Sequence, residues 1–134
     1  MSQENVEIVR GLYEHWARGD YAFADLYDAD VEFARIGATG GGVNGRWRGL
    51  EDVWAGFVEY VNAFADLRTE TERIIDLGDD RVFVFSRQIA SGRHSGVPIE
   101  HELGDLITLS DGKVVSFHSY WDRAEALEAA GLSE

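Results

Sequence analysis

The spacing of apolar residues changes near Leu67, and this change constrains the fold more than any other feature. Before Leu67, over 5–18 and 50–64, apolar residues recur every three or four positions, as on one face of an α-helix. After it they alternate with polar residues, as in β-strands. Helices followed by consecutive strands predict an α+β fold rather than an alternating α/β fold. The 134 residues suit a single domain, 1–134.

The first half of the chain predicts three helices and one strand. Helical spacing covers 5–18, and Asp20 then suits the N-cap of a short second helix that continues to Leu26. Alternation predicts a strand over 31–36, and helical spacing returns over 50–64. Between them, the segment 37–45 holds five glycines in nine residues. It lacks a phosphate-loop ending, so it is either a mobile lid over a pocket or a flexible connection.

The second half predicts a four-stranded antiparallel meander. Its strands are expected over 68–77, 81–90, 99–109 and 113–121. The pair Asp111-Gly112 is a strong hairpin signal between the last two strands. Asp122, with Glu125 three residues later, predicts the cap of a terminal helix that ends at Gly131.

Alternation assigns apolar residues to both faces of this sheet. We expect the helices to pack on one face, with an inward set that comprises Leu103, Asp105, Ile107, Leu109, Phe117, Ser119 and Trp121. The outward set includes Leu106, Val114, His118 and Tyr120. Because the outward set is also partly apolar, a second copy of the chain is expected to cover it, which predicts a homodimer through the outer sheet face.

The composition excludes several classes of protein. A net charge of −13 argues against nucleic acid and anionic membrane surfaces as partners. The chain has no cysteine, which rules out disulfides and thiolate metal sites, and 45% hydrophobic residues argue against disorder. No stretch approaches the roughly 20 apolar residues of a membrane span, and the first residues lack a signal-peptide pattern. A cytoplasmic location is expected.

Five segments carry a resemblance to a known family: Ala17–Asp20, Asp30–Phe33, Ile74–Asp79, Thr108–Val115 and Tyr120–Leu127. With the order of elements, they resemble the nuclear-transport-factor-two-like superfamily, in its SnoaL-like and ketosteroid-isomerase-like branch. The resemblance implies a cone in which helices wrap against a curved antiparallel sheet around a central apolar pocket. That superfamily includes isomerases, cyclases, hydrolases and dehydratases, as well as members that only bind ligands or dimerise.

The resemblance also assigns three positions of the ketosteroid isomerase site. Its oxyanion-hole aspartate matches Asp105, whereas its general base falls on Phe33, which cannot accept a proton. Its tyrosine falls on Leu12, and Tyr13 is rotated by about 100° around the helix axis. Steroid isomerase activity is therefore not expected. The polyketide-cyclase members use a single pocket aspartate, a role that Asp105 alone could fill.

Asp105 and Arg35 are the candidate catalytic residues. Asp105 lies between apolar inward neighbours, so burial should raise its pKa and prepare it for proton exchange. Alternatively, it follows Gly104 at a strand irregularity and makes structural hydrogen bonds, or it meets a buried arginine. Arg35 could pair with Asp105 or hold an anionic or enolate oxygen, unless it is a solvated arginine beside the glycine-rich segment.

A further eight residues are candidate ligand contacts. The hydrogen-bonding candidates are Ser86, Gln88 and Ser119, and the aromatic candidates are Trp16, Trp54, Phe57, Phe117 and Trp121. Aromatic residues at helical spacing also serve simply as core. The histidines His94, His101 and His118 lack metal-ligand spacing, because Glu100, His101 and Glu102 alternate between the faces of a strand. No metal or other cofactor is expected.

The leading hypothesis is a small-molecule-binding protein that performs cofactor-free proton transfer on an apolar carbonyl compound, such as cyclisation, isomerisation or hydration. Asp105 would be its acid and base. The alternative is a non-catalytic binding or dimerisation module of the same fold. A cavity of a few hundred cubic ångströms beside Asp105 would favour the first, and a filled interior the second.

Overall fold

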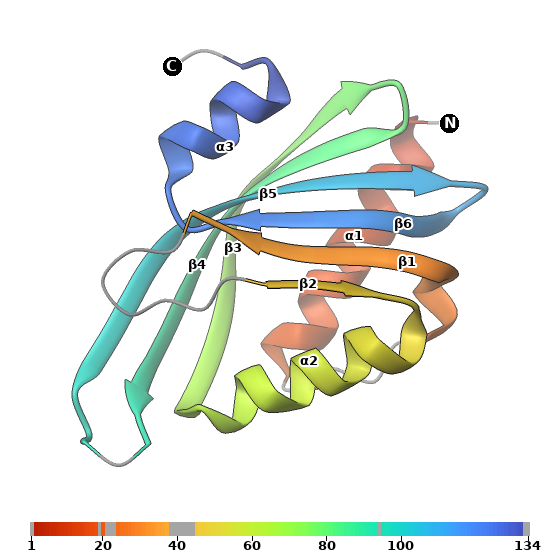
Figure 1. Ribbon diagram of the computed structural model, residues 1–134. Coiled ribbons are helices and arrows are strands. Elements are labelled where there is room, and N and C mark those ends of the chain that lie inside the picture. Colours follow the sequence, from red (N-terminus) through yellow and green to blue (C-terminus); the bar gives the residue numbers. More distant parts are fainter. Residues whose placement is uncertain (1, 19, 21–23, 38–44, 94, 133–134) are drawn as a thin grey trace.

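The computed structural model describes residues 2–18, 20, 24–37, 45–93 and 95–132 (Figure 1). Its helices are α1 (Ser2–Ala17), α2 (Leu50–Asn62) and α3 (Arg123–Ala130). Its strands are β1 (Tyr27–Ile36), β2 (Gly45–Arg48), β3 (Phe64–Gly78), β4 (Arg81–Gly92), β5 (Pro98–Ser110) and β6 (Lys113–Tyr120). A short 3₁₀ turn, Ala24–Leu26, precedes β1. The expected α+β fold is confirmed.

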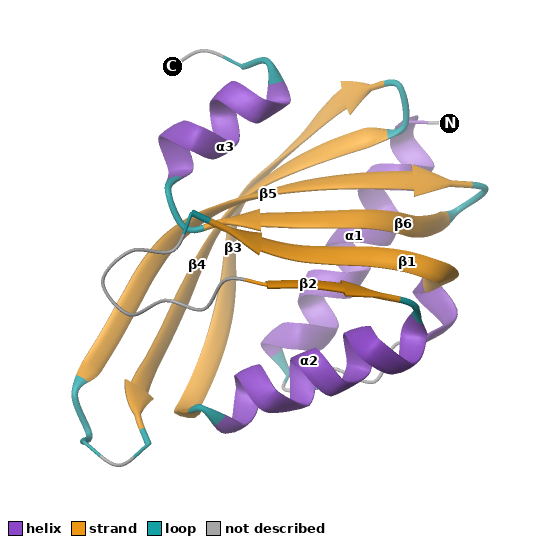
Figure 2. Cartoon of the chain, in the orientation of Figure 1, coloured by secondary structure: helices purple, strands orange, loops and turns teal. Residues whose placement is uncertain are grey.

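The strands form one six-stranded sheet in the order β2-β1-β6-β5-β4-β3 (Figure 2). The meander of β3 to β6 is antiparallel as predicted, and its last hairpin turns through Asp111 and Gly112, both at positive φ. The sheet as a whole is mixed rather than antiparallel, because β1 runs parallel to β6, with Phe33 beside Phe117. This pairing places β1, the first strand of the chain, among the core residues that lie between the sheet and the helices α1 and α2.

Three register shifts along β3 accompany its curvature. They fall between Ala65 and Arg68, between Thr71 and Arg73, and between Asp76 and Gly78. Each shift leaves residues of β3 without a one-to-one partner on β4, and such bulges bend and twist a strand. The sheet therefore has a concave face, which α1 and α2 cover.

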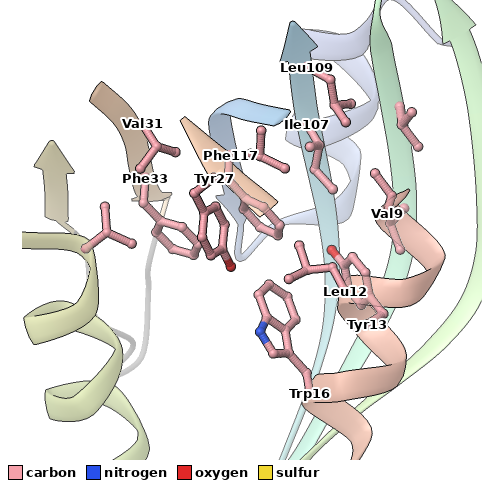
Figure 3. Packing of buried hydrophobic residues seen from close by; sticks show 14 of the residues in the cluster. Val9, Leu12, Tyr13, Trp16, Tyr27, Val31, Phe33, Ile107, Leu109 and Phe117 are labelled. Carbon is pink, nitrogen blue, oxygen red and sulfur yellow. The ribbon is translucent and has the colours of Figure 1, made fainter. Parts of the chain in front are cut away.

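The inner core lies between this concave face and the helices α1 and α2. Figure 3 shows Leu12, Tyr13 and Trp16 of α1 directed toward the strands. Phe33 and Phe117 stack with ring centres 4.8 Å apart, and Phe57 of α2 meets Phe33 edge to face at 4.9 Å. Aromatic side chains from α1, α2, β1 and β6 thus pack against one another in this core.

The third helix packs on the opposite face of the sheet, so the prediction that all helices share one face is wrong (Figure 1). Ala126, Leu127 and Ala130 of α3 pack with Phe83 and Tyr120 in a separate outer core. The close approach requires Gly104, because a Cβ there would lie 2.4 Å from Cβ of Ala126. The side chain of Asp122 caps α3, accepting hydrogen bonds from the backbone N–H of Ala124 and Glu125, as predicted.

Other local predictions also changed. Strand β2, Gly45–Arg48, was not predicted, and α2 ends at Asn62 because Phe64 already belongs to β3. Val114 faces the inner core with Leu109 rather than the outer face, because the β5–β6 register shifts just before Leu109. The proposed lid and most of the expected second helix fall on residues 38–44 and 21–23, outside the described part of the chain. None of the described helices is long and apolar enough to cross a membrane.

Candidate functional site

Asp105 lies in the middle of β5, on the concave side of the sheet, and only 3% of its surface is exposed. Its strand neighbours are Val84 of β4 and Ser119 of β6. Leu103 and Ile107, two residues away on either side, share its face and belong to the buried residues of the protein. The alternation of β5 thus carries one carboxyl group into an apolar interior, as the sequence predicted.

Three hydroxyl groups hold the carboxyl group of Asp105. Ser119 donates a hydrogen bond to Oδ1 at 2.8 Å, and Ser86 donates one to Oδ2 at 2.9 Å. The hydroxyl of Tyr13, on α1, also donates to Oδ2. Because these donors come from α1, β4 and β6, the carboxyl group connects the first helix to the sheet.

Burial dominates the titration of this cluster. It raises the pKa of Asp105 from its ordinary value, although the hydrogen bonds from Tyr13, Ser119 and Ser86 and the charge of Arg35 favour the ionised form. Burial and the neighbouring Asp105 raise the pKa of Tyr13 well above its usual range. Tyr13 therefore remains a hydrogen-bond donor, and Asp105 is a carboxyl group that binds a proton more readily than an exposed one.

Arg35 is a buried cation, 7% exposed, near the end of β1. Its guanidinium carbon lies 3.6 Å from the centre of the Tyr60 ring and 4.9 Å from that of Phe33. Within the described residues, no carboxylate forms an ion pair with Arg35, and its Nε has no hydrogen-bond partner. Burial lowers the pKa of Arg35, with an opposing contribution from Asp105. The aromatic rings stabilise the charge, but they cannot accept the N–H of Nε as a carboxylate would.

Asp105 and Arg35 line the same small cavity between α1, α2 and the concave face. Its other lining residues are Trp16, Phe33, Phe57, Tyr60, Val61, Leu67, Thr69, Gln88, Phe117 and Ser119. The volume is about 30 Å³, which is room for one or two water molecules. Ligand pockets usually measure roughly 300–1,000 Å³. The expected cavity of a few hundred cubic ångströms beside Asp105 is therefore absent from the part of the chain that the structure describes.

The structure brings most of the predicted site residues together. Seven of them line the cavity: Trp16, Arg35, Phe57, Gln88, Asp105, Phe117 and Ser119. Ser86 lies behind it, hydrogen-bonded to Asp105. Trp54 does not line the cavity, since it is 47% exposed on the outer side of α2. Trp121 follows β6 and contacts the rings of Tyr60 and His101 instead.

Sequence reasoning missed Tyr13, Tyr60 and Thr69. Tyr13 lies on the apolar face of α1 with Val9 and Trp16, as its spacing predicted, but it was not named as a site residue because the resemblance places the ketosteroid isomerase tyrosine at Leu12. Tyr60 lies three residues after Phe57 on the buried face of α2, and its hydroxyl donates to Oε1 of Gln88. Tyr13 therefore reaches Asp105, although the resemblance placed the ketosteroid isomerase tyrosine at Leu12, and the base position, Phe33, carries no group that accepts a proton.

The described histidines lie apart from this cavity. His118 is on the outer side of β6, with Nε2 3.2 Å from Oε1 of Glu32, and this agrees with its predicted outward position. His101 packs against Trp121, and burial lowers its pKa. His94 falls outside the described residues. Across the described ranges, no three His, Asp or Glu side chains are grouped as ligands for a metal ion.

Fold and site together define a class of α+β protein in which helices close a curved sheet around one buried carboxyl group. The model of the SnoaL-like domain matches residues 9–117 of the sequence. The chain belongs to this family, within the nuclear-transport-factor-two-like fold, and the resemblance in the sequence is confirmed. No sequence among the curated proteins matches the chain.

Solved structures show the same fold at low sequence identity. Bal32a, from a soil-derived mobile gene cassette, has a TM-score of 0.79 at 20% identity, covering 96% of each chain. TerC, co-crystallised with polyporic acid, has a TM-score of 0.76 at 19% identity, covering 96% of this chain and 98% of TerC. A protein from Jannaschia sp. CCS1 that bears the name of a SnoaL-like polyketide cyclase has a TM-score of 0.75 at 18% identity, covering 98% of this chain and 94% of its own.

Proposed function

We propose that the chain binds a small apolar carbonyl compound beside Asp105 and catalyses a proton transfer within it. The observation that carries this proposal is that a buried carboxyl group and a buried cation without an ion-pair partner among the described residues line the same cavity. Burial raises the pKa of Asp105, so this carboxyl group keeps a proton to higher pH than an exposed aspartate does, as suits a group that takes up and returns a proton. A fixed cation stabilises the oxygen on which negative charge develops.

The roles follow from the positions of the two groups. Ionised Asp105 removes a proton from the carbon next to the carbonyl group, and the electron pair of that C–H bond moves to the carbonyl oxygen to form an enolate. Arg35 holds the enolate oxygen. Protonated Asp105 then returns the proton to another atom of the ligand, which completes an isomerisation or assists a ring closure. The reaction is balanced within the ligand and needs no electron donor or acceptor.

The hydroxyl groups around Asp105 fix its orientation and its proton affinity. Ser86 and Tyr13 both donate to Oδ2, whereas Oδ1 accepts from Ser119, which itself lines the cavity. Two donors against one indicate Oδ1 as the oxygen with the greater remaining capacity for a proton. The cyclase name of one structural neighbour agrees with this class of reaction.

A specific observation favours the alternative, a module that does not catalyse. The cavity beside Asp105 holds only about 30 Å³, because five aromatic side chains converge on it. A ligand therefore enters only if part of this wall moves. If it does not move, the hydroxyl groups around Asp105 serve to join α1 to the sheet, and the protein acts through another surface.

Hydrogen exchange into deuterated water separates the two functions without knowledge of the product. A panel of polycyclic ketones is first screened by thermal shift, since a ligand of the native state raises Tm. Each hit is then incubated with protein in D₂O, and deuterium at the carbon next to the carbonyl is followed by NMR. We expect exchange above the buffer rate for the wild type and loss of that excess in Asp105→Asn. Equal exchange in both proteins would refute the catalytic role.

We also propose a homodimer through the outer sheet face, over a smaller area than the sequence predicted. Helix α3 covers Phe83 and Tyr120, so a second copy is not needed to bury them. On the remaining outer surface, Glu32 forms an ion pair with Arg46 and lies 3.2 Å from Nε2 of His118. Sedimentation at micromolar concentration is expected to show a dimer, and a monomer would contradict this proposal.

A further inference from the structure

A second and larger cavity shares Arg35 and Tyr60 with the cavity beside Asp105. We call it the outer pocket; it measures about 220 Å³ and is lined by Arg35, Trp47, Gly56, Glu59, Tyr60 and Ala63. An apolar protein cavity of about 150 Å³ is known to hold benzene. The outer pocket therefore has room for an aromatic group of one or two fused rings.

Small residues of α2 and one aromatic side chain of β2 shape this pocket. Gly56 and Tyr60 lie on the same side of α2, and Ala63, the C-cap residue, continues this helical spacing. A Cβ atom at Gly56 would lie 2.8 Å from Cε2 of Trp47, so only glycine lets the indole lie this close to the helix. Trp47 also packs edge to face against Phe33, with ring centres 6.3 Å apart. The result is a flat aromatic wall facing a helix surface with little side-chain bulk.

Arg35 supplies the polar group of the outer pocket. Its guanidinium group lies over the ring of Tyr60, and the N–H groups of a guanidinium lie in its own plane, at the edge of such a stack. A carboxylate meets these donors with two parallel hydrogen bonds, the strongest geometry available to arginine. Glu59 is an exposed residue of the same pocket, and its carboxylate would repel a second negative group on the ligand.

We propose that the outer pocket is a recognition site for an aromatic monoanion. The ring system lies against Trp47 and over Gly56 and Ala63, and a carboxylate or enolate oxygen binds Arg35. This inference rests on the proposed function in one respect: it takes the bound molecule to be the ligand whose reacting end faces Asp105. It narrows the class of that ligand to aromatic carbonyl compounds that also carry an acidic oxygen, a carboxylate or an enol.

The test uses 2-naphthoate as the probe and its uncharged analogue 2-naphthamide as the comparison, by calorimetry at pH 7. We expect the wild type to bind 2-naphthoate at least about tenfold more tightly than the amide, because a hydrogen bond to a charged group outweighs a neutral one. Arg35→Met should abolish this preference. Ala63→Phe should weaken the binding of both probes at least tenfold by filling the pocket.

Ala55→Phe is the matched control, because Ala55 is exposed on α2 and does not line the pocket. It should bind both probes like the wild type. Three results would overturn the inference: no binding of 2-naphthoate to the wild type at millimolar concentration, equal binding of the acid and the amide, or binding unchanged by Ala63→Phe. If Ala63→Phe leaves binding unchanged but Arg35→Met abolishes the preference for the acid, the probe binds beside Asp105 and not in the outer pocket. That outcome would refute this inference but not the proposed function. If Ala63→Phe weakens binding of the probes but the wild type catalyses no deuterium exchange, only the proposed function is refuted.

Discussion

Removal of the Tyr13 hydroxyl should destabilise the protein more at high pH than at low pH. The substitution Tyr13→Phe deletes one of three hydrogen bonds to a buried carboxyl group and leaves the ring in place. A hydrogen bond to a neutral group contributes roughly 0.5–1.5 kcal/mol and one to a charged group roughly 1.5–3 kcal/mol. The loss should therefore be about 1 kcal/mol where Asp105 is protonated and about 2 kcal/mol where it is ionised.

Tyr27→Phe is the matched control for this experiment. Tyr27 is also buried, at 4% exposure, but its hydroxyl has no hydrogen-bond partner among the described residues. Deletion of a buried hydroxyl that makes no hydrogen bond removes only an unfavourable desolvation, so stability should stay equal or rise. The two variants thus differ in the one feature under test, the contact with Asp105.

The free energy of unfolding is measured by urea titration at pH 4 and pH 8, with tryptophan fluorescence as the signal. We expect Tyr13→Phe to lower it at both pH values and by more at pH 8. Tyr27→Phe should lower it at neither. An equal loss for the two variants, or a loss for Tyr13→Phe that does not change with pH, would refute the account of the carboxyl group.

Three further predictions concern the buried charges and the packing of α3. Because the pKa of Asp105 is raised in the folded state, its contribution to stability is present below the ordinary value of 3.8 and is lost as the pH rises through the folded pKa. The free energy of unfolding of the wild type, measured by urea titration, should therefore fall as the pH rises through this range. The free energy of unfolding of Asp105→Asn should change less. Arg35→Met should leave stability unchanged or raise it, because a buried cation without an ion-pair partner is replaced by an apolar side chain of similar length, and a drop of several kcal/mol in urea titration would contradict this. Gly104→Val should cost about 1–3 kcal/mol by overpacking against Ala126, whereas a thermal midpoint equal to that of the wild type would show that α3 is not held against β5.

The spacing of apolar residues predicted the main helices and the meander, because an element that is buried on one face has apolar residues at regular intervals. It could not predict β2, whose four residues alternate too briefly to be distinguished from a loop beside the glycines. Nor could it place β1 beside β6, since this pairing depends on how the chain returns across the sheet. Strand pairing between distant segments is a tertiary property.

The candidate site was predictable where alternation alone decides the direction of a side chain. Asp105 and Ser119 face the cavity as the parity of β5 and β6 requires. Tyr13 was predicted on the apolar face of α1 but not as a site residue, because helical spacing does not show which strand residue a buried side chain meets. Trp54 lies at the margin of the apolar stripe of α2, where spacing does not distinguish a buried from an exposed position. The volume of the cavity depends on how aromatic side chains interlock, and no pattern in the sequence records it.

The most direct test of the central claim is the titration of Asp105 in the folded protein. Carbon-13 NMR of the side-chain carboxyl carbon, assigned by comparison with Asp105→Asn, follows its protonation as the pH is raised. We predict a midpoint above the ordinary value of 3.8, and a displacement of that midpoint when a ketone identified by thermal shift is bound. A midpoint at or below that value, unchanged by ligand, would show that Asp105 is a structural carboxylate and contradict its role in proton transfer.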